Sequence, residues 1–233
     1  MSEIADPQDL ARKFGRRHML GMTTAAVAMP MLGAIFPAGA GNSSQPDLHF
    51  SALYQGSPVG EHRVAFKSDG ERLIVTTHIE ITIKVLFFTA FHFAHDAIEI
   101  WHAGRLHSVE STTDDNGTRL AVTGAAASDG FRIIGVDGPF LAAPQLLTTN
   151  TLWNSRLLRE SRMIDIQYGG EVGLVVKPLG AEQILTPRGP VAALRYQIIT
   201  PNYAGSLFFD ADGQWVKSLM ERQGEILEYE LLS

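Results

Sequence analysis

The stretch Gly205-Ser-Leu-Phe-Phe-Asp-Ala-Asp-Gly-Gln-Trp-Val-Lys-Ser-Leu219 carries the clearest structural signal in the chain. β-forming residues lie on both sides of Asp210-Ala-Asp-Gly213. Aspartate bonds its own backbone and tolerates the left-handed region, and glycine adopts a positive φ without steric cost. The stretch therefore predicts a β-hairpin, which we place at the end of a long meander.

Strand signals separated by turn formers also fill the chain from Leu48 onward, and Asp115-Asn-Gly117 is a second strong hairpin turn. In residues 72–84 the alternation is clean, because one face carries Leu73, Val75, Thr77, Ile79, Ile81 and Ile83. Further strands are expected at 49–55, 59–67, 87–101, 106–113, 119–123, 131–136, 163–168, 171–177, 181–185, 191–200 and 225–232. The sequence predicts an all-β fold with one long, curved, mostly antiparallel sheet, as an open barrel or roll.

One region departs from this pattern. The break at Asp137-Gly-Pro139 begins an irregular region, and the alternation fails between Pro144 and Glu160. Asn150-Thr151 can cap a helix, so we expect one short helix over Leu152–Glu160. We expect this helix to plug or cap the concave side of the sheet.

The first 40 residues resemble an export signal rather than part of the fold. Arg16-Arg17 precedes an apolar stretch without charge from Met22 to Phe36, and Pro37-Ala-Gly-Ala40 follows as a cleavage site. The apolar stretch is shorter than the roughly 20 residues that a membrane span needs, so no stable span is expected. We predict cleavage after Ala40, a polar linker at 41–47, a single domain at 48–233 and a periplasmic location.

The route of export has two interpretations. The paired arginines favour the twin-arginine route. Gly15 and Met19 depart from its usual residues, so the general secretory route stays as the alternative.

Composition excludes several classes of function. The chain has 233 residues, with 19 basic and 25 acidic residues and a formal charge of −6, so a nucleic-acid partner is not expected. It contains no cysteine, which excludes disulfides and thiolate metal sites. We expect a monomer.

Several motifs resemble those of a proteobacterial family of exported proteins that carry a domain of unknown function. The first is the aromatic-Asp-x-x-Gly-x-Trp pattern near the C-terminus, with Phe208-Phe209 where the family usually has Trp-Tyr. The others, in order, are Tyr54–His62, His95–Glu99, Gly104–Leu106, Asp115–Gly117, Thr151–Asn154 and Leu179–Glu182. The resemblance implies an antiparallel sheet protein without an assigned activity or catalytic residues. It also implies a distant similarity to periplasmic curved-sheet proteins such as lipoprotein-localisation factors.

Two groups of residues suggest metal binding but fit it poorly. His92, His95, Asp96 and Glu99 are ligand-capable, but His92 and His95 point to opposite faces of a strand. Only His92 with Asp96, or His95 with Glu99, would share a side. We expect no metal there, and solvated or hydrogen-bonded histidines instead.

The second group is Asp210, Asp212 and Glu221, which occupy calcium-loop positions one, three and twelve. Trp215 stands where that loop needs glycine, so the tight-turn interpretation is favoured. No cofactor is expected.

The sequence holds neither a G-x-S-x-G nucleophile motif nor an H-E-x-x-H zinc motif, and no phosphate-binding loop. We therefore assign no catalytic residue. An enzyme acting on an envelope lipid or glycan through His95, Glu99 or Asp210 stays as an alternative.

The aromatic residues suggest the leading function. In a curved sheet they either fill the interior as core or line a cavity for a hydrophobic ligand. The sequence predicts a non-enzymatic periplasmic binding or carrier protein for an apolar molecule such as a lipid. A third alternative is an assembly module that docks a partner by an exposed sheet edge. The candidate ligand-binding residues are Phe91, Phe93, Trp101, Trp153, Phe208 and Trp215.

Overall fold

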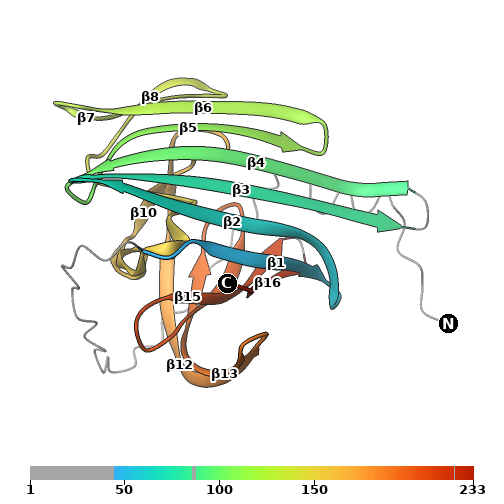
Figure 1. Cartoon of the computed structure of the whole chain (residues 1–233). Helices are drawn as coiled ribbons and strands as arrows, with labels where there is room; N and C mark the ends of the chain where they lie inside the picture. The colour runs from blue at the N-terminus through green and yellow to red at the C-terminus, as the bar shows by residue number, and fades with distance from the viewer. Residues whose placement is uncertain (1–44, 86–87, 223) are drawn as a thin grey trace, which may run out of the picture.

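The structure is a computed structural model that describes residues 45–85, 88–222 and 224–233. One 13-stranded sheet has the order β12-β13-β14-β15-β16-β1-β2-β3-β4-β5-β6-β7-β8, and every neighbouring pair in it is antiparallel (Figure 1). Its strands are β1 (Leu48–Tyr54), β2 (Ser57–Asp69), β3 (Arg72–Val85), β4 (Phe88–His102), β5 (Arg105–Asp115), β6 (Thr118–Ala127), β7 (Gly130–Gly135), β8 (Gly138–Ala142), β12 (Val175–Thr186), β13 (Gly189–Ile199), β14 (Ala204–Phe209), β15 (Trp215–Arg222) and β16 (Glu225–Leu231). The predicted all-β class, with one large curved antiparallel sheet, is confirmed.

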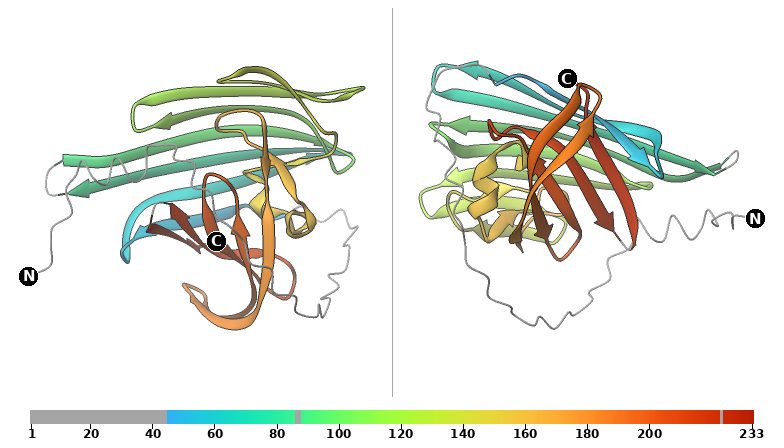
Figure 2. Two further views of the ribbon diagram at one scale, coloured as in Figure 1. Left: turned by 180° about the vertical axis from the view of Figure 1, so that it is seen from behind. Right: turned by 90° about the horizontal axis from the view of Figure 1, so that it is seen from below.

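The long sheet curls on itself, so that its C-terminal half faces its N-terminal half. Figure 2 shows β12–β16 crossing beneath the layer formed by β2–β8. The first and last strands of the sheet, β12 and β8, are not paired with each other. The barrel is therefore open, and its concave side encloses the core.

The alternation predicted for residues 72–84 is present in β3. Val75 and Ile81 are buried, whereas Thr76 and Glu80 are exposed. Because side chains on a strand point to opposite faces in turn, one face of β3 is core and the other meets solvent.

The hairpin at Asp210–Gly213 also forms as predicted, between β14 and β15. Oδ1 of Asp210 accepts hydrogen bonds from the backbone N–H of Asp212 at 3.0 Å and of Gln214 at 2.8 Å. Gly213 takes a φ of 78°. The aspartate and the glycine thus perform the roles that their chemistry predicts.

The predicted continuous helix over Leu152–Glu160 is wrong. Two short 3₁₀-helices, η1 (Thr151–Trp153) and η2 (Ser155–Arg159), replace it. The physical reason is Asn154, which is extended at φ −106° and ψ 108° and accepts a hydrogen bond from the backbone N–H of Arg156. Its side chain ends one turn and begins the next, whereas Asn150 makes no capping bond.

The region expected to be irregular holds further strands. The chain forms the edge strand β8 and then β9 (Leu147–Thr148). Together with β10 (Arg162–Ile164) and β11 (Glu171–Gly173), β9 makes a second sheet of three strands. The strands expected at 171–177 and 181–185 divide differently, because Val175–Thr186 is one strand with a register shift between Pro178 and Gly180.

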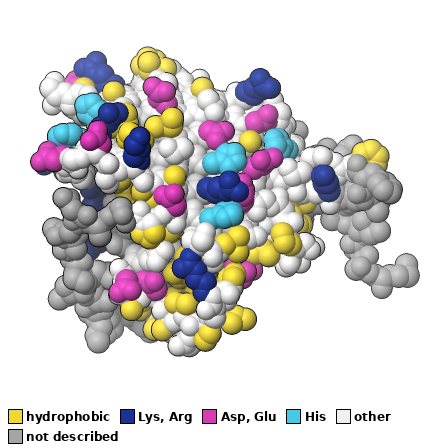
Figure 3. All heavy atoms as spheres, viewed as in Figure 1, with side chains coloured by type: hydrophobic (Ala, Val, Ile, Leu, Met, Phe, Trp, Pro, Cys, Tyr) yellow, Lys and Arg dark blue, Asp and Glu magenta, His cyan; other side chains and the backbone are white. Residues whose placement is uncertain are grey.

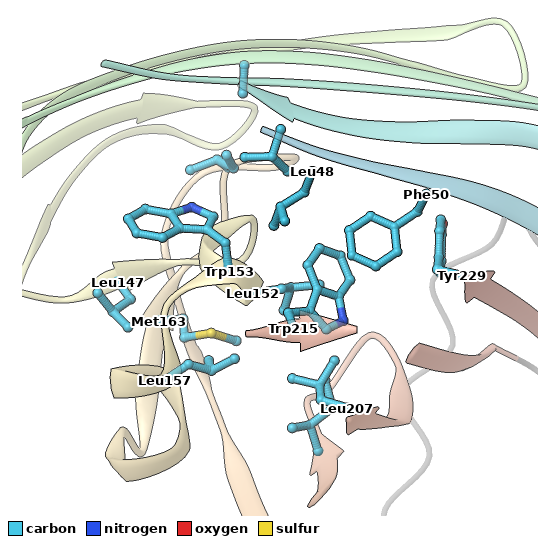
Figure 4. Packing of buried hydrophobic residues seen from close by; sticks show 14 of the residues in the cluster. Leu48, Phe50, Leu147, Leu152, Trp153, Leu157, Met163, Leu207, Trp215 and Tyr229 are labelled. Carbon is cyan, nitrogen blue, oxygen red and sulfur yellow. The ribbon is translucent and has the colours of Figure 1, made fainter. Parts of the chain in front are cut away.

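We call residues 146–173, which contain η1, η2 and the small sheet, the plug. The plug lies between the two halves of the curved sheet (Figure 2). Its fully buried hydrophobic residues are Leu147, Leu157, Met163, Ile164 and Ile166, and Figure 4 shows the first three grouped together. The plug thus fills part of the concave side, as was expected of the helix.

The predicted signal peptide at 1–40, its cleavage site after Ala40 and residues 41–44 of the linker lie outside the described residues. Phe87 also lies outside them. No helix in the described part of the chain combines the length and the apolar character needed to cross a membrane.

Candidate functional site

A cavity of about 200 Å³ lies on the concave side, and it is partly open to solvent. Apolar side chains form most of its wall. They are Ile79, Ile81, Phe91, Phe93, Leu152, Val172, Trp215, Met220 and Leu227.

One wall of the cavity comes from the β3–β4 hairpin. Ile81 is paired with Phe93 and Ile83 with Phe91 across the two strands. Directly opposed residues on antiparallel strands point to the same face, so the isoleucines and phenylalanines form one continuous apolar surface. Phe91 and Phe93 stack with their ring centroids 6.5 Å apart.

The opposite wall comes from the C-terminal half of the sheet. Trp215 begins β15, and Leu227 and Tyr229 point inward from β16. Trp215 is only 1% exposed and packs against Phe50 of β1 at a centroid distance of 4.0 Å. Figure 4 shows Phe50, Trp215 and Tyr229 side by side.

His62 of β2 lies between these walls and is only 3% exposed. Its ring centroid lies 5.3 Å from that of Trp215 and 5.6 Å from that of Tyr229, and both pairs are in edge-on geometry. The pKa of His62 is lowered to about 3, mainly because the ring is buried and in smaller part because of its electrostatic interaction with His95 and His78. His62 is therefore neutral near pH 7.

His95 of β4 also lines the cavity, and it connects the sheet to the plug. Its Nδ1 lies 2.7 Å from Oγ1 of Thr113, and its Nε2 lies 2.9 Å from Nδ2 of Asn150. Burial lowers the pKa of His95 to about 4, against the opposing charge of Asp96. This neutral imidazole therefore has a hydrogen-bond partner at each nitrogen, one of which belongs to the plug.

Glu99 lies four residues further along the same face of β4 and is 1% exposed. Trp101 Nε1 donates to its carboxylate at 3.1 Å, and the Thr148 hydroxyl donates to the other oxygen. Burial raises the pKa of Glu99 to about 7, although both hydrogen bonds oppose this change. Glu99 does not line the cavity, and its contact with Thr148 attaches the plug to the sheet.

A polar segment of the cavity wall surrounds Asp165, which is 5% exposed. Its Oδ1 accepts from the backbone N–H of Gln167 at 2.8 Å and of Tyr168 at 3.1 Å. Its Oδ2 accepts from Nδ2 of Asn202 at 3.2 Å. Burial and the charge of Asp165 raise the pKa of the neighbouring Tyr203, which also lines the cavity.

The turn that carries Asp165 is held against β7 by a contact that only glycine fits. A Cβ on Gly135 would lie 2.3 Å from the carbonyl oxygen of Tyr168. Gly169 has a φ of 85°, and the backbone N–H of Val136 donates to the Tyr168 carbonyl at 2.8 Å. This close backbone approach fixes the position of the polar segment.

Three of the six candidate residues line the cavity, namely Phe91, Phe93 and Trp215. The other three are buried in the core outside its lining. Trp101 packs against Trp153 at a centroid distance of 5.7 Å. The Arg195 guanidinium lies over the Phe208 ring, with its carbon 5.4 Å from the ring centroid.

Sequence reasoning missed His62, Tyr229, Met220 and the polar segment around Asp165. A signal existed for His62, since it lies on the buried face of β2, two residues before the buried Val64. Nothing in the local pattern predicts that the plug brings Asp165 to the cavity.

The other candidate groups are not brought together at the cavity. Of the alternative catalytic residues, His95 lines the cavity, Glu99 lies behind its wall and Asp210 forms the β14–β15 turn. Asp96 points outward and pairs with His78 at 2.7 Å. Figure 3 shows histidine and charged side chains interspersed over the face in view.

Within the described residues, no cluster of three or more His, Asp or Glu side chains could hold a metal ion. The two edge strands of the large sheet are β8 and β12. Docking of a partner protein on an exposed sheet edge, the third alternative function, stays a prediction.

Comparison with known proteins places the chain in a family. Residues 50–232 match the family described as a domain of unknown function, DUF6134. The chain belongs to this family. No curated protein matches the sequence of this DUF6134 protein. The expected membership of a family with a domain of unknown function is thus confirmed, whereas the similarity to lipoprotein-localisation factors stays a prediction.

A solved structure shares the fold of the DUF6134 protein. It is the crystal structure of a beta-barrel-like protein of domain of unknown function DUF1849 from Brucella abortus. The two are 8% identical, with a TM-score of 0.59 over 80% of this chain and 95% of that chain. At this identity the likeness supports the beta-barrel-like architecture alone.

Proposed function

We propose that this protein binds an apolar molecule, such as part of a lipid, in the cavity between the two halves of its sheet. The observation that carries the proposal is the partly open cavity, whose wall is mostly aliphatic and aromatic. Ligand sites in proteins are typically concave and apolar with a few placed polar groups. The cavity has this composition, with His62, His95 and Asp165 among its polar groups.

The size of the cavity limits what it can enclose. A closed cavity of about 150 Å³ admits benzene, whereas pockets for drug-sized ligands run to roughly 300–1,000 Å³. At about 200 Å³, this cavity holds one ring or a short length of alkyl chain. The rest of a longer ligand would leave through the open side.

Binding without catalysis agrees with the hydrogen bonding of the side chains that the enzymatic alternative would use. His95 is occupied at both nitrogens, and Asp210 is occupied by its own turn. We also propose that binding takes place in the periplasm, on the basis of the export signal expected in residues 1–40. A carrier there would shield an apolar molecule from water.

Filling the cavity is expected to abolish binding. Ile79 is half-buried at the cavity wall, and Ile79→Trp would place an indole in the space that the ligand occupies. Titration with the neutral fluorescent probe N-phenyl-1-naphthylamine is expected to brighten the probe with the wild type, and at least about tenfold more weakly with the variant.

The matched control for this test is Ile98→Trp on β4, because Ile98 is 48% exposed and does not line the cavity. This variant is expected to bind the probe as the wild type does. Equal binding by Ile79→Trp, or a dark probe with the wild type, would contradict the proposed function.

A further inference from the structure

The cavity offers no positive charge to a ligand. None of the described residues that line it is Lys or Arg, and two carboxylates, Asp165 and Glu221, are among them. Its histidines, His62 and His95, are neutral near pH 7, because burial lowers the pKa of each. A buried anion without a counter-charge is strongly destabilised. A fatty-acid carboxylate or a phosphate would therefore be excluded from the enclosed part of the cavity.

The cavity also contains a polar side chain that lacks a partner. Neither ring nitrogen of His62 forms a hydrogen bond with a described residue, and its Nε2 is fully enclosed. The ring is held in place by aromatic contacts with Phe50, Trp215 and Tyr229. Buried polar groups are almost always paired, so an unpaired imidazole at a cavity wall has a hydrogen bond available for a ligand.

We propose that the cavity selects uncharged apolar molecules that carry one hydroxyl-type group, and that His62 hydrogen-bonds to that group. This inference rests on the proposed binding function and adds the class of ligand to it. A neutral imidazole has one donor and one acceptor nitrogen, so Nδ1 can pair with a hydroxyl in either tautomer, whereas the enclosed Nε2 has no surface open to a ligand. The apolar part of the ligand would contact the Ile81 and Phe93 wall.

Three ligands with the same alkyl chain test the charge selectivity. Decan-1-ol, decanoate and decylammonium would each displace N-phenyl-1-naphthylamine from the wild-type protein near neutral pH. We expect decan-1-ol to displace the probe at concentrations at least about tenfold lower than decanoate, because only decanoate must leave a buried charge unpaired. Equal displacement by decanoate overturns this inference and leaves the proposed function standing.

Two further outcomes have separate meanings. Stronger displacement by decylammonium than by decan-1-ol also overturns the inference, because the carboxylates of Asp165 and Glu221 would then select the ligand. A wild-type protein that binds neither the probe nor any of the three ligands contradicts the proposed function itself.

The role of His62 is tested by His62→Phe, which keeps an aromatic ring and removes both nitrogens. We expect this variant to bind decan-1-ol about tenfold more weakly, and to bind naphthalene, which has no hydroxyl, within about twofold of the wild type. Equal weakening of both ligands, or of neither, overturns the role of His62. His78→Phe is the matched control, since His78 lies on the outer face of β3 and does not line the cavity.

Met220→Lys tests the charge selectivity while leaving His62 in place. Met220 is half-buried and lines the cavity on β15, so a lysine there can extend its ammonium group towards solvent. We expect the binding of decanoate to strengthen at least about tenfold and that of decan-1-ol to stay within a few-fold. Unchanged discrimination between the two would overturn the electrostatic part of the inference.

Discussion

Trp215→Ala is expected to lower the free energy of unfolding by about 4 kcal/mol, because it removes a fully buried indole from the centre of the core. The indole stacks on Phe50 at 4.0 Å and meets His62 at 5.3 Å. Its Nε1 donates to the Lys217 carbonyl at 3.0 Å. Truncation therefore removes apolar burial, aromatic contacts and one hydrogen bond at the same position.

Urea unfolding followed by circular dichroism measures this effect, as a lower midpoint at an unchanged slope. Trp215→Phe is the control, because it keeps an aromatic ring against Phe50. We expect this variant to lose about half as much free energy of unfolding as Trp215→Ala. A loss below about 1 kcal/mol for Trp215→Ala would mean that the two halves of the sheet are not held together through this residue.

Glu99→Gln is expected to stabilise the protein by roughly 3 kcal/mol above pH 7 and to leave its stability unchanged below about pH 4.5. The folded protein raises the pKa of this carboxyl from 4.5 to about 7, so the folded state holds the proton more tightly than the unfolded state. Stability that depends on the protonated form is therefore lost as pH rises from 4.5 to about 7. Glutamine stays uncharged, can accept from Trp101 and can donate to Thr148.

His62 and His95 have the opposite effect on the pH dependence of stability. The pKa values of His62 and His95 are lowered, so their contribution to stability is lost as pH falls below 6.5. The difference between the wild type and Glu99→Gln isolates the carboxyl, because both proteins contain the same histidines.

Urea unfolding at a series of pH values would measure this difference, with Glu110→Gln on the exposed face of β5 as the matched control. A constant difference across the pH range would show that Glu99 does not titrate as its burial implies.

Sequence patterns predicted the parts of this fold that depend on local chemistry. The alternation in β3 and the Asp-Ala-Asp-Gly turn formed as expected, because side-chain direction and turn conformation are set within a few residues. A segment that plugs the concave side was expected, but the internal structure of the plug was not predicted. Its short strands and 3₁₀ turns are held by contacts with distant strands, such as Thr148 with Glu99 and Gly169 with Gly135.

The candidate ligand-binding residues show the same distinction between local patterns and contacts with distant strands. Phe91 and Phe93 face inward because of the alternation of β4, which the sequence shows. Trp101 shares that face, yet it lies under Trp153 of the plug and outside the cavity lining. Separating core from cavity lining requires the position of the plug, and aromatic composition does not contain that information.

The crystal structure of a complex with 4-bromobenzyl alcohol, which has one ring and one hydroxyl, tests the central claim most directly, because the anomalous signal of bromine locates the ligand. We expect a bromine peak inside the cavity, in contact with Ile79, Phe93 and Leu152, and a hydroxyl beside His62. An empty cavity, with bromine bound only on the outer surface, would contradict it.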